Sequence, residues 1–338
     1  MERQVTKSAT LSLTYLNSRG FDQFLTINAD APYPGTPCVN CTPTSNLYRY
    51  VSEGNFKQNQ FIVNTNVRVG SKLQLFGYYT LNYANSDTAG VNYFPSNSWD
   101  ISQDWGRSSF DVRHRLFLGG TVGLPYLLRF SPFMILSSGT PYDVTSPVDL
   151  NGDSQYNDRP GYVSTATCPN PPGGASPTPT GPNSSIYCTP LGTFDVLPNL
   201  APTPERIVPI NFATGPNHFV MNFRLTKTIG LGARTKESGP TPGGGGPGQG
   251  GGGHRGGGGP RGPLFGGGPT MMSANSDRRY NLTLGVSMRN AFNDVNVANP
   301  SGVVGSRFFD TANALQGGSF AGTSAANRRI DFQAIFTF

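Results

Sequence analysis

Residues 329–338 read Arg329-Ile330-Asp331-Phe332-Gln333-Ala334-Ile335-Phe336-Thr337-Phe338, with an apolar side chain at every even position. Successive side chains of a β-strand point to opposite faces of the sheet, so this spacing predicts a strand with one apolar side. About ten residues also suffice for a tilted strand to cross a bilayer. An edge strand of a soluble protein alternates in the same way, so the segments upstream decide between the two cases.

The same two-residue alternation recurs upstream, at residues 11–15, 61–69, 73–83, 108–123, 128–134, 219–226 and 281–289. We therefore expect about eight long strands, each with an apolar face opposed to a face rich in Asn, Gln, Thr and Arg. This is the pattern of a transmembrane antiparallel β-barrel, in which one side of the sheet meets lipid and the other a water-filled lumen.

The connections between these strands sort by length. Tight turns are expected at 70–71 and 123–126, and long connections at 18–57, 86–107, 139–217 and 292–328. A soluble β-sandwich has strands of about five or six residues, and its loops do not sort in this way. Short turns at one end and long loops at the other are typical of outer-membrane barrels. The Gly-rich connection at about 230–279 is the exception.

Composition narrows the function classes. Of 338 residues, 36% are hydrophobic and 13% are charged, a low charged fraction for a soluble enzyme. No run of 18 apolar residues predicts a transmembrane helix, and residues 1–7 lack the apolar core of a signal peptide. The net charge of +6 comes from scattered basic residues, so we expect no nucleic-acid partner.

Several motifs resemble the Oar-like branch of the TonB-dependent receptor family. They are Ser18-Arg19-Gly20 with Asn28-Ala29-Asp30-Ala31-Pro32, residues 75–82 (LFGYYTLN), Asp111-Val112-Arg113-His114-Arg115, Asp149-Leu150-Asn151-Gly152-Asp153 with Asn157-Asp158-Arg159-Pro160, and residues 290–296 (NAFNDVN). The aromatic end at Phe336 and Phe338 is similar to the C-terminal assembly signal of bacterial outer-membrane proteins. It implies the barrel assembly machinery as a partner.

The resemblance implies that residues 1–338 are the C-terminal part of a barrel in the bacterial outer membrane, with its last eight of about twenty-two strands. It further implies a plug domain and a TonB-contacting segment, both absent from this chain, as is a signal peptide. The implied function is active, TonB-dependent uptake of a scarce ligand such as a siderophore, oligosaccharide or peptide. The alternatives are a non-transporting surface barrel (an adhesin or a secretion-associated protein), a small barrel closed by these strands alone, and a soluble β-rich binding protein.

No enzyme is expected. The sequence offers no nucleophile with a base, no paired carboxylates at catalytic spacing and no phosphate loop between a strand and a helix. Arg113, Arg115, Arg224 and Arg289 fall on the polar faces of their segments, so we expect them to point into the lumen.

Residues 149–158 place oxygen-bearing side chains close together, at Asp149, Asn151, Asp153, Asn157 and Asp158. Such a loop can hold Ca²⁺, but it lacks the glycine and glutamate positions of an EF-hand loop, and an Asx-rich turn is the favoured interpretation. No other cofactor is expected. Trp99 and Trp105 are candidates for stacking on a ligand, with a place in the aromatic girdle or in loop packing favoured.

The four cysteines form two local pairs, Cys38 with Cys41 and Cys168 with Cys188. Disulfides in an oxidising compartment are favoured over a redox or metal site. The Gly-rich segment 238–270 is expected to be a disordered insert, with an RNA-binding Arg-Gly-Gly segment as the less favoured alternative. Strand parity, with the orientation that the resemblance implies, places this insert in the periplasm.

Overall fold

The computed structural model describes residues 2–33, 46–70, 72–163, 168, 177–181, 184–198, 206–234, 278–316 and 326–338. Cys38, Cys41 and the Gly-rich segment 238–270 lie outside these ranges, so the expectations about them remain predictions. None of the described helical residues forms a segment long and apolar enough to cross a membrane. The described helical structure includes one short 3-10 turn, η1 (Ile101–Asp104).

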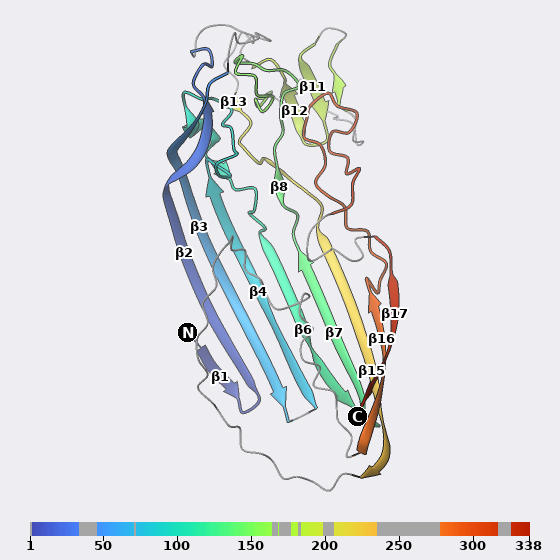
Figure 1. Cartoon of the computed structure of the whole chain (residues 1–338). Helices are drawn as coiled ribbons and strands as arrows, with labels where there is room; N and C mark the ends of the chain where they lie inside the picture. The colour runs from blue at the N-terminus through green and yellow to red at the C-terminus, as the bar shows by residue number, and fades with distance from the viewer. Residues whose placement is uncertain are drawn as a thin grey trace.

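One large antiparallel sheet dominates the described chain (Figure 1). Its strands follow the order β1-β2-β3-β4-β6-β7-β15-β16-β17, and β5 pairs with β4 beside β6. The bounds are β1 (Glu2–Thr6), β2 (Ala9–Asn28), β3 (Tyr48–Val69), β4 (Leu73–Ser86), β5 (Gly106–Arg107), β6 (His114–Leu124), β7 (Leu128–Ser137), β15 (His218–Arg234), β16 (Arg278–Arg289) and β17 (Arg329–Thr337). All eight strands expected from the alternation are present.

The strand boundaries differ from the expectation in three places. β1 was not expected. β2 continues to Asn28 and β3 begins at Tyr48, so the connection expected at 18–57 is shortened to residues 29–47. Register shifts near Gly20 and Gln23 interrupt the two-residue alternation there, which hides this part of the strands. The strand expected from residue 108 begins only at His114. Residues 108–113 instead form a turn, in which the buried Asp111 accepts a hydrogen bond from the backbone N–H of Ala84 at 3.0 Å.

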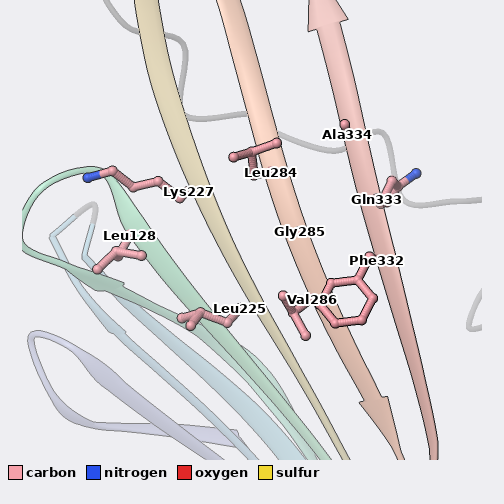
Figure 2. A pocket seen from close by; sticks show the side chains of 9 residues that line it. All are labelled: Leu128, Leu225, Lys227, Leu284, Gly285, Val286, Phe332, Gln333 and Ala334. Atoms are coloured by element: carbon pink, nitrogen blue, oxygen red, sulfur yellow. The ribbon is translucent and has the colours of Figure 1, made fainter.

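Across β15, β16 and β17 the sheet has one apolar and one polar face, because the register places side chains of the same kind beside one another. Leu225 of β15, Val286 of β16 and Phe332 of β17 are direct neighbours in one row. Figure 2 shows these three side chains lining a groove of about 480 Å³ on the apolar face. One residue further along, Arg224 and Ser287 are paired on the opposite face. Phe332 is 81% exposed, as expected for a side chain that meets lipid.

The connections gather at two ends of the sheet. Tight turns join β3 to β4 and β6 to β7 at what we call the turn end, and the long connections that follow β2, β4, β7 and β16 lie at the opposite loop end (Figure 1). The loop end carries two small sheets. One has the order β10-β11-β12-β9-β13 and the other pairs β14 with β8. Their bounds are β8 (Pro141–Tyr142), β9 (Gly161–Tyr162), β10 (Thr178–Pro179), β11 (Ile186–Thr189), β12 (Gly192–Asp195), β13 (Arg206–Ile207) and β14 (Ala213–Thr214).

The main cluster of buried apolar residues lies at the loop end, although a few side chains of the large sheet, such as Leu25 and Phe117, are also buried. The fully buried members of the cluster include Val144, Phe194, Val208, Val304 and Phe309. They come from the connection between β7 and β15 and from the one between β16 and β17, and a backbone bridge joins Thr145 to Val303. The long connections are therefore a packed layer with its own core.

Both edges of the large sheet are open among the described residues. β1 covers β2 only along residues 9–12, and no described pairing joins β17 back to β1 or β2. An unpaired strand edge leaves backbone N–H and C=O groups without partners, which is costly wherever water is absent. The described strands therefore require further pairing at both edges if the sheet lies in lipid.

The two faces predict opposite responses to a buried charge. Val286→Arg places a cation on the apolar face and should lower the free energy of unfolding by roughly 2 to 4 kcal/mol if this row lies near the bilayer midplane. Ser287→Arg places the same group on the polar face beside Asp331 and should cost less than about 1 kcal/mol. Urea unfolding in lipid vesicles measures both. Equal costs would mean that the two faces are assigned wrongly.

Candidate ligand-binding layer and polar inner face

The connections at the loop end are fixed to one another by side-chain hydrogen bonds to backbone carbonyls. Asn151 Nδ2 donates to the carbonyl oxygen of Ser96 at 2.7 Å, and Asn157 Nδ2 donates to that of Phe94 at 2.8 Å. The backbone N–H of Thr26, near the end of β2, donates to the carbonyl of Tyr93 at 2.9 Å. Three segments far apart in sequence thus form one surface above the sheet.

A buried ion pair lies at the centre of this layer. Arg159 Nη2 is 2.8 Å from Asp104 Oδ1, and the two side chains are 3% and 1% exposed. Arg159 also donates to the carbonyl of Gln103, and Asp104 accepts from the backbone N–H and the hydroxyl of Ser96. The Nε and Nη1 atoms of Arg159 have no partner among the described residues. The pair joins the connection before β5 to the connection after β8.

Two further polar groups lie partly buried beside the pair. The hydroxyl of Tyr93 donates to Asp104 Oδ2 at 2.8 Å, and its pKa is raised far above the usual value, first by burial and then by the negative charge of Asp104. Asp143 accepts from the backbone N–H of Asn211. Burial raises the pKa of Asp143, although that hydrogen bond and the positive charge of Arg159 oppose the rise. The layer therefore holds acidic groups in surroundings that disfavour their charged forms.

In the loop at 149–158, aspartate side chains accept hydrogen bonds from backbone N–H groups of the same loop. Asp149 accepts from the N–H groups of Gly152 at 2.6 Å and Ser154 at 2.8 Å, and Asp158 accepts from that of Leu150 at 2.7 Å. Gly152 has a φ of 73°, as a tight turn requires. Among the described residues, no group of three or more His, Cys, Asp or Glu side chains is placed to hold a metal ion. The hydrogen bonds to Asp149 and Asp158 make this segment an Asx-rich turn.

Two carboxyl groups of this loop have raised pKa values because burial disfavours their charged forms. Burial, opposed by the hydrogen bond from Leu150 N–H, raises the pKa of Asp158 to about 7. Burial also raises the pKa of Asp153 to about 6, with a smaller contribution from the charge of Asp149. Asp158 therefore gains and loses its proton near neutral pH.

The two tryptophans lie in different surroundings. Trp99 Nε1 donates to the carbonyl of Ala31 at 3.1 Å, and its ring packs on Tyr33 with centroids 5.6 Å apart, which is loop packing. Trp105 lines a hollow with Lys57 and Tyr83 on the outer side of the sheet. No contact that the structure describes joins either tryptophan ring to the Asp104–Arg159 pair.

The polar face of the large sheet carries three of the four arginines expected there. Arg224 Nη2 donates to Gln333 Oε1 at 2.6 Å, and Arg289 Nε is 3.3 Å from Asp331 Oδ2. Arg115 is paired with Thr80 and Ser137 on the same face. The contacts of Arg224 and Arg289 join β15, β16 and β17 and place charge along this face of the sheet.

Arg113 is not on that face, so its expected position was wrong. Its guanidinium lies over the ring of Tyr83, 3.9 Å from the centroid, and Tyr83 shares the apolar face with Leu81 and Tyr79. The expectation failed because residues 108–113 form a turn and not a strand, so the two-residue alternation does not apply to them.

The structure also locates the expected disulfide and the aromatic chain end. Cys168 and Cys188 form a disulfide with an S–S distance of 2.08 Å, the pairing that the sequence suggested. Phe336 lies on the apolar face of β17 and stacks on Tyr280 at 6.0 Å, whereas Phe338 is 95% exposed at the chain end.

Sequence reasoning missed the roles of Asp104, Asp111 and Arg159. Asp104 and Arg159 are far apart in sequence, so no local motif signals their ion pair. Asp111 was seen only as part of a motif, and its contacts with Ala84 and two arginines depend on the turn at 108–113. The sequence carries no local signal for either set of contacts.

Comparison with known proteins identifies the architecture. Residues 1–237 match the family model described as the outer membrane beta barrel domain. The chain also resembles the crystal structure of the outer membrane transporter YddB from Escherichia coli, at 8% identity and a TM-score of 0.44, over 99% of this chain and 31% of that one. This chain thus spans about a third of the length of that structure. No curated protein sequence matches.

The family match confirms the location expected from the alternation, the bacterial outer membrane. In such barrels the short turns lie on the periplasmic side and the long loops on the extracellular side. The turn end is therefore periplasmic, and the packed layer around Asp104 and Arg159 is extracellular.

Removing Arg159 should loosen the extracellular layer and leave the sheet intact. Arg159→Ala leaves Asp104 buried without its counter-charge, which costs about 3 to 5 kcal/mol for a pair of this kind. Limited proteolysis of the detergent-solubilised protein should show faster cleavage in residues 87–105 and 138–163. Arg206→Ala removes an exposed cation of the same layer and serves as the control. Unchanged cleavage in Arg159→Ala would show that the ion pair does not hold the layer together.

The raised pKa of Asp158 predicts a layer that is more stable in mild acid. Its folded pKa of about 7 exceeds the ordinary 3.8, so between these values the folded carboxyl holds a proton that the unfolded one has released. The resulting stability is fully present below about pH 4 and is lost as the pH rises through 7. Amide hydrogen exchange at residues 150–154, corrected for intrinsic rates, should slow from pH 8 to pH 5. Asp158→Asn should abolish most of that change, and a persistent change would point to a different group.

Proposed function

We propose, from the premise that the chain belongs to the family of outer membrane beta barrel domains, that it forms part of the wall of a larger ligand-gated uptake receptor. The receptor is of the TonB-dependent kind that the sequence motifs resemble. The observation that carries the proposal is the pair of open sheet edges, at β2 and at β17, in a sheet whose outer face is apolar. Such edges in lipid call for further strands.

The extracellular layer supports a binding role for the complete receptor. Its connections share a buried core and a buried ion pair, so the layer has a defined shape before any ligand arrives. A preformed surface binds a ligand without first ordering its own loops, which would otherwise weaken binding. The class of ligand we propose is a scarce nutrient such as a siderophore, an oligosaccharide or a peptide.

The polar inner face supports a lumen that contacts a plug. Arg224, Arg289 and Asp331 place charges along one side of β15–β17, where a plug domain of the complete protein would lie. In this proposal, energy from the inner membrane reaches the plug through TonB and displaces it, and the barrel assembly machinery inserts the wall. The wall itself performs no covalent chemistry, so the protein is not an enzyme.

Disulfide trapping separates a larger barrel from a small one closed by these strands alone. In the complete protein with all four native cysteines replaced, Phe332→Cys on β17 is combined in turn with Leu13→Cys, Tyr15→Cys or Asn17→Cys on β2. The proposal predicts no intramolecular cross-link for any of these pairs. Val286→Cys with Phe332→Cys, which are register partners, provides the positive control. An efficient β2–β17 cross-link would show a barrel closed on itself.

Uptake is tested in living cells that carry the complete gene. Accumulation of radiolabelled ferric siderophores, oligosaccharides and peptides is compared in cells with and without TonB. The proposal predicts that at least one class accumulates only when both the gene and TonB are present. Normal amounts of barrel in the outer membrane, with no TonB-dependent uptake of any class, would favour the non-transporting surface barrel.

A further inference from the structure

On the outer face of the wall, the side chains change from apolar to polar at the same height on β2, β3 and β4. The pairing gives one apolar row and then, toward the extracellular end, two polar rows. These rows are Tyr15–Phe61–Leu81, then Asn17–Asn59–Tyr83, then Arg19–Lys57–Asn85–Arg107. Side chains directly opposite one another across strands lie close together. The last row, which we call the basic row, therefore brings three cations to one line on the outer surface.

The basic row lies at the depth of lipid headgroups. On β3, Lys57 lies twelve positions before Val69, which is at the periplasmic turn. At about 3.3 Å per residue this is about 40 Å along the strand, or about 30 Å of depth for a tilt of about 40°. The apolar band of an outer-membrane barrel is about 25 Å tall. Lys57 is thus just beyond the band, in the extracellular leaflet.

The basic row borders a hollow that is open to the outside. Lys57, Asn59, Tyr83, Asn85 and Trp105 line this space of about 380 Å³. Lys57 and Trp105 are exposed, and so is Arg19 on the neighbouring strand. The hollow therefore offers a flexible ammonium group, two amides and two amphipathic rings to a molecule that approaches from the membrane.

Two arginines beside the hollow are held in place by one buried carboxylate. Asp111 Oδ2 is 3.1 Å from Arg107 Nε and 2.8 Å from Arg113 Nη2, and the Asp111 side chain is 1% exposed. Arg113 also lies over the ring of Tyr83. The single negative charge of Asp111 is thus paired with two positive charges, and Arg19 and Lys57 contribute two further positive charges. The patch carries an excess of positive charge at the membrane surface.

We propose that the basic row, with Arg113, Tyr83 and Trp105, binds the phosphorylated glycolipid of the outer leaflet. The lipid phosphates contact Arg19, Lys57 and the two arginines that Asp111 orients, since guanidinium and ammonium groups bind phosphate through strong charge-assisted hydrogen bonds. The rings of Tyr83 and Trp105 lie at the boundary between sugars and acyl chains, where amphipathic rings are favoured. The acyl chains run down the apolar rows below. This inference rests on the outer-membrane location and not on the proposed uptake function.

The test uses the complete protein, purified in detergent and stripped of lipid, with bisphosphorylated lipid A as the probe. The variant R19Q/K57Q removes two exposed cations of the basic row. The control R49Q/R206Q removes two exposed cations of the extracellular end outside the basic row. Binding is measured by thermophoresis. R19Q/K57Q should bind about tenfold more weakly than the unmodified protein, and the control should bind as the unmodified protein does.

A second probe distinguishes phosphate recognition from general lipid adhesion. Lipid A lacking both phosphates should bind the unmodified protein about as weakly as R19Q/K57Q binds the phosphorylated form. Equal affinity of R19Q/K57Q and the unmodified protein for phosphorylated lipid A would overturn the proposal, as would equal binding of the two probes. Heat-modifiable migration on gels verifies folding. If the double variant does not fold, K57Q alone should still weaken binding, and unchanged binding of K57Q would overturn the proposal.

Discussion

The pairing of every backbone N–H and C=O group with a neighbouring strand is the constraint on which the rest of this structure depends. In lipid an unpaired group costs several kcal/mol, because no water can replace the missing partner. The continuous ladders from β2 through β17 satisfy this requirement along the wall. Once the ladders are fixed, side chains must alternate between lipid and lumen. That alternation gives rows such as Leu225–Val286–Phe332 on one face and charged residues on the other.

A wall one sheet thick buries few apolar side chains, and the main apolar cluster of this protein lies in the loops. Phe194, Val304 and Phe309 are fully buried in the extracellular layer, where water surrounds the loops and the hydrophobic effect acts as in a soluble domain. The same layer buries the Arg159–Asp104 pair. The protein thus combines a membrane sheet held by backbone hydrogen bonds with an outer layer held by side-chain packing and charge.

Local alternation in the sequence predicted the strands and their faces, whereas contacts between distant segments could not be predicted from it. The faces of β15, β16 and β17 were read correctly from every second residue, since the predicted parts of these three strands alternate without a register shift. The turn at 108–113 was missed because Asp111 caps the backbone of Ala84, a partner distant in sequence. Arg113 was therefore assigned to the wrong side. The packed extracellular layer was not predicted either, because its ion pair and its core join segments that no motif links.

The central claim is that one face of a single sheet meets lipid and the other meets water. Spin labels placed one at a time along residues 281–289 and 330–337 of the complete protein in vesicles test it directly. Collision with oxygen, which concentrates in lipid, should be high at Leu282, Leu284 and Val286 and low at Thr283, Gly285 and Ser287. A water-soluble nickel reagent should give the opposite pattern. Oxygen collision that varies smoothly along the strand, or that peaks at the odd positions of β16, would contradict the account.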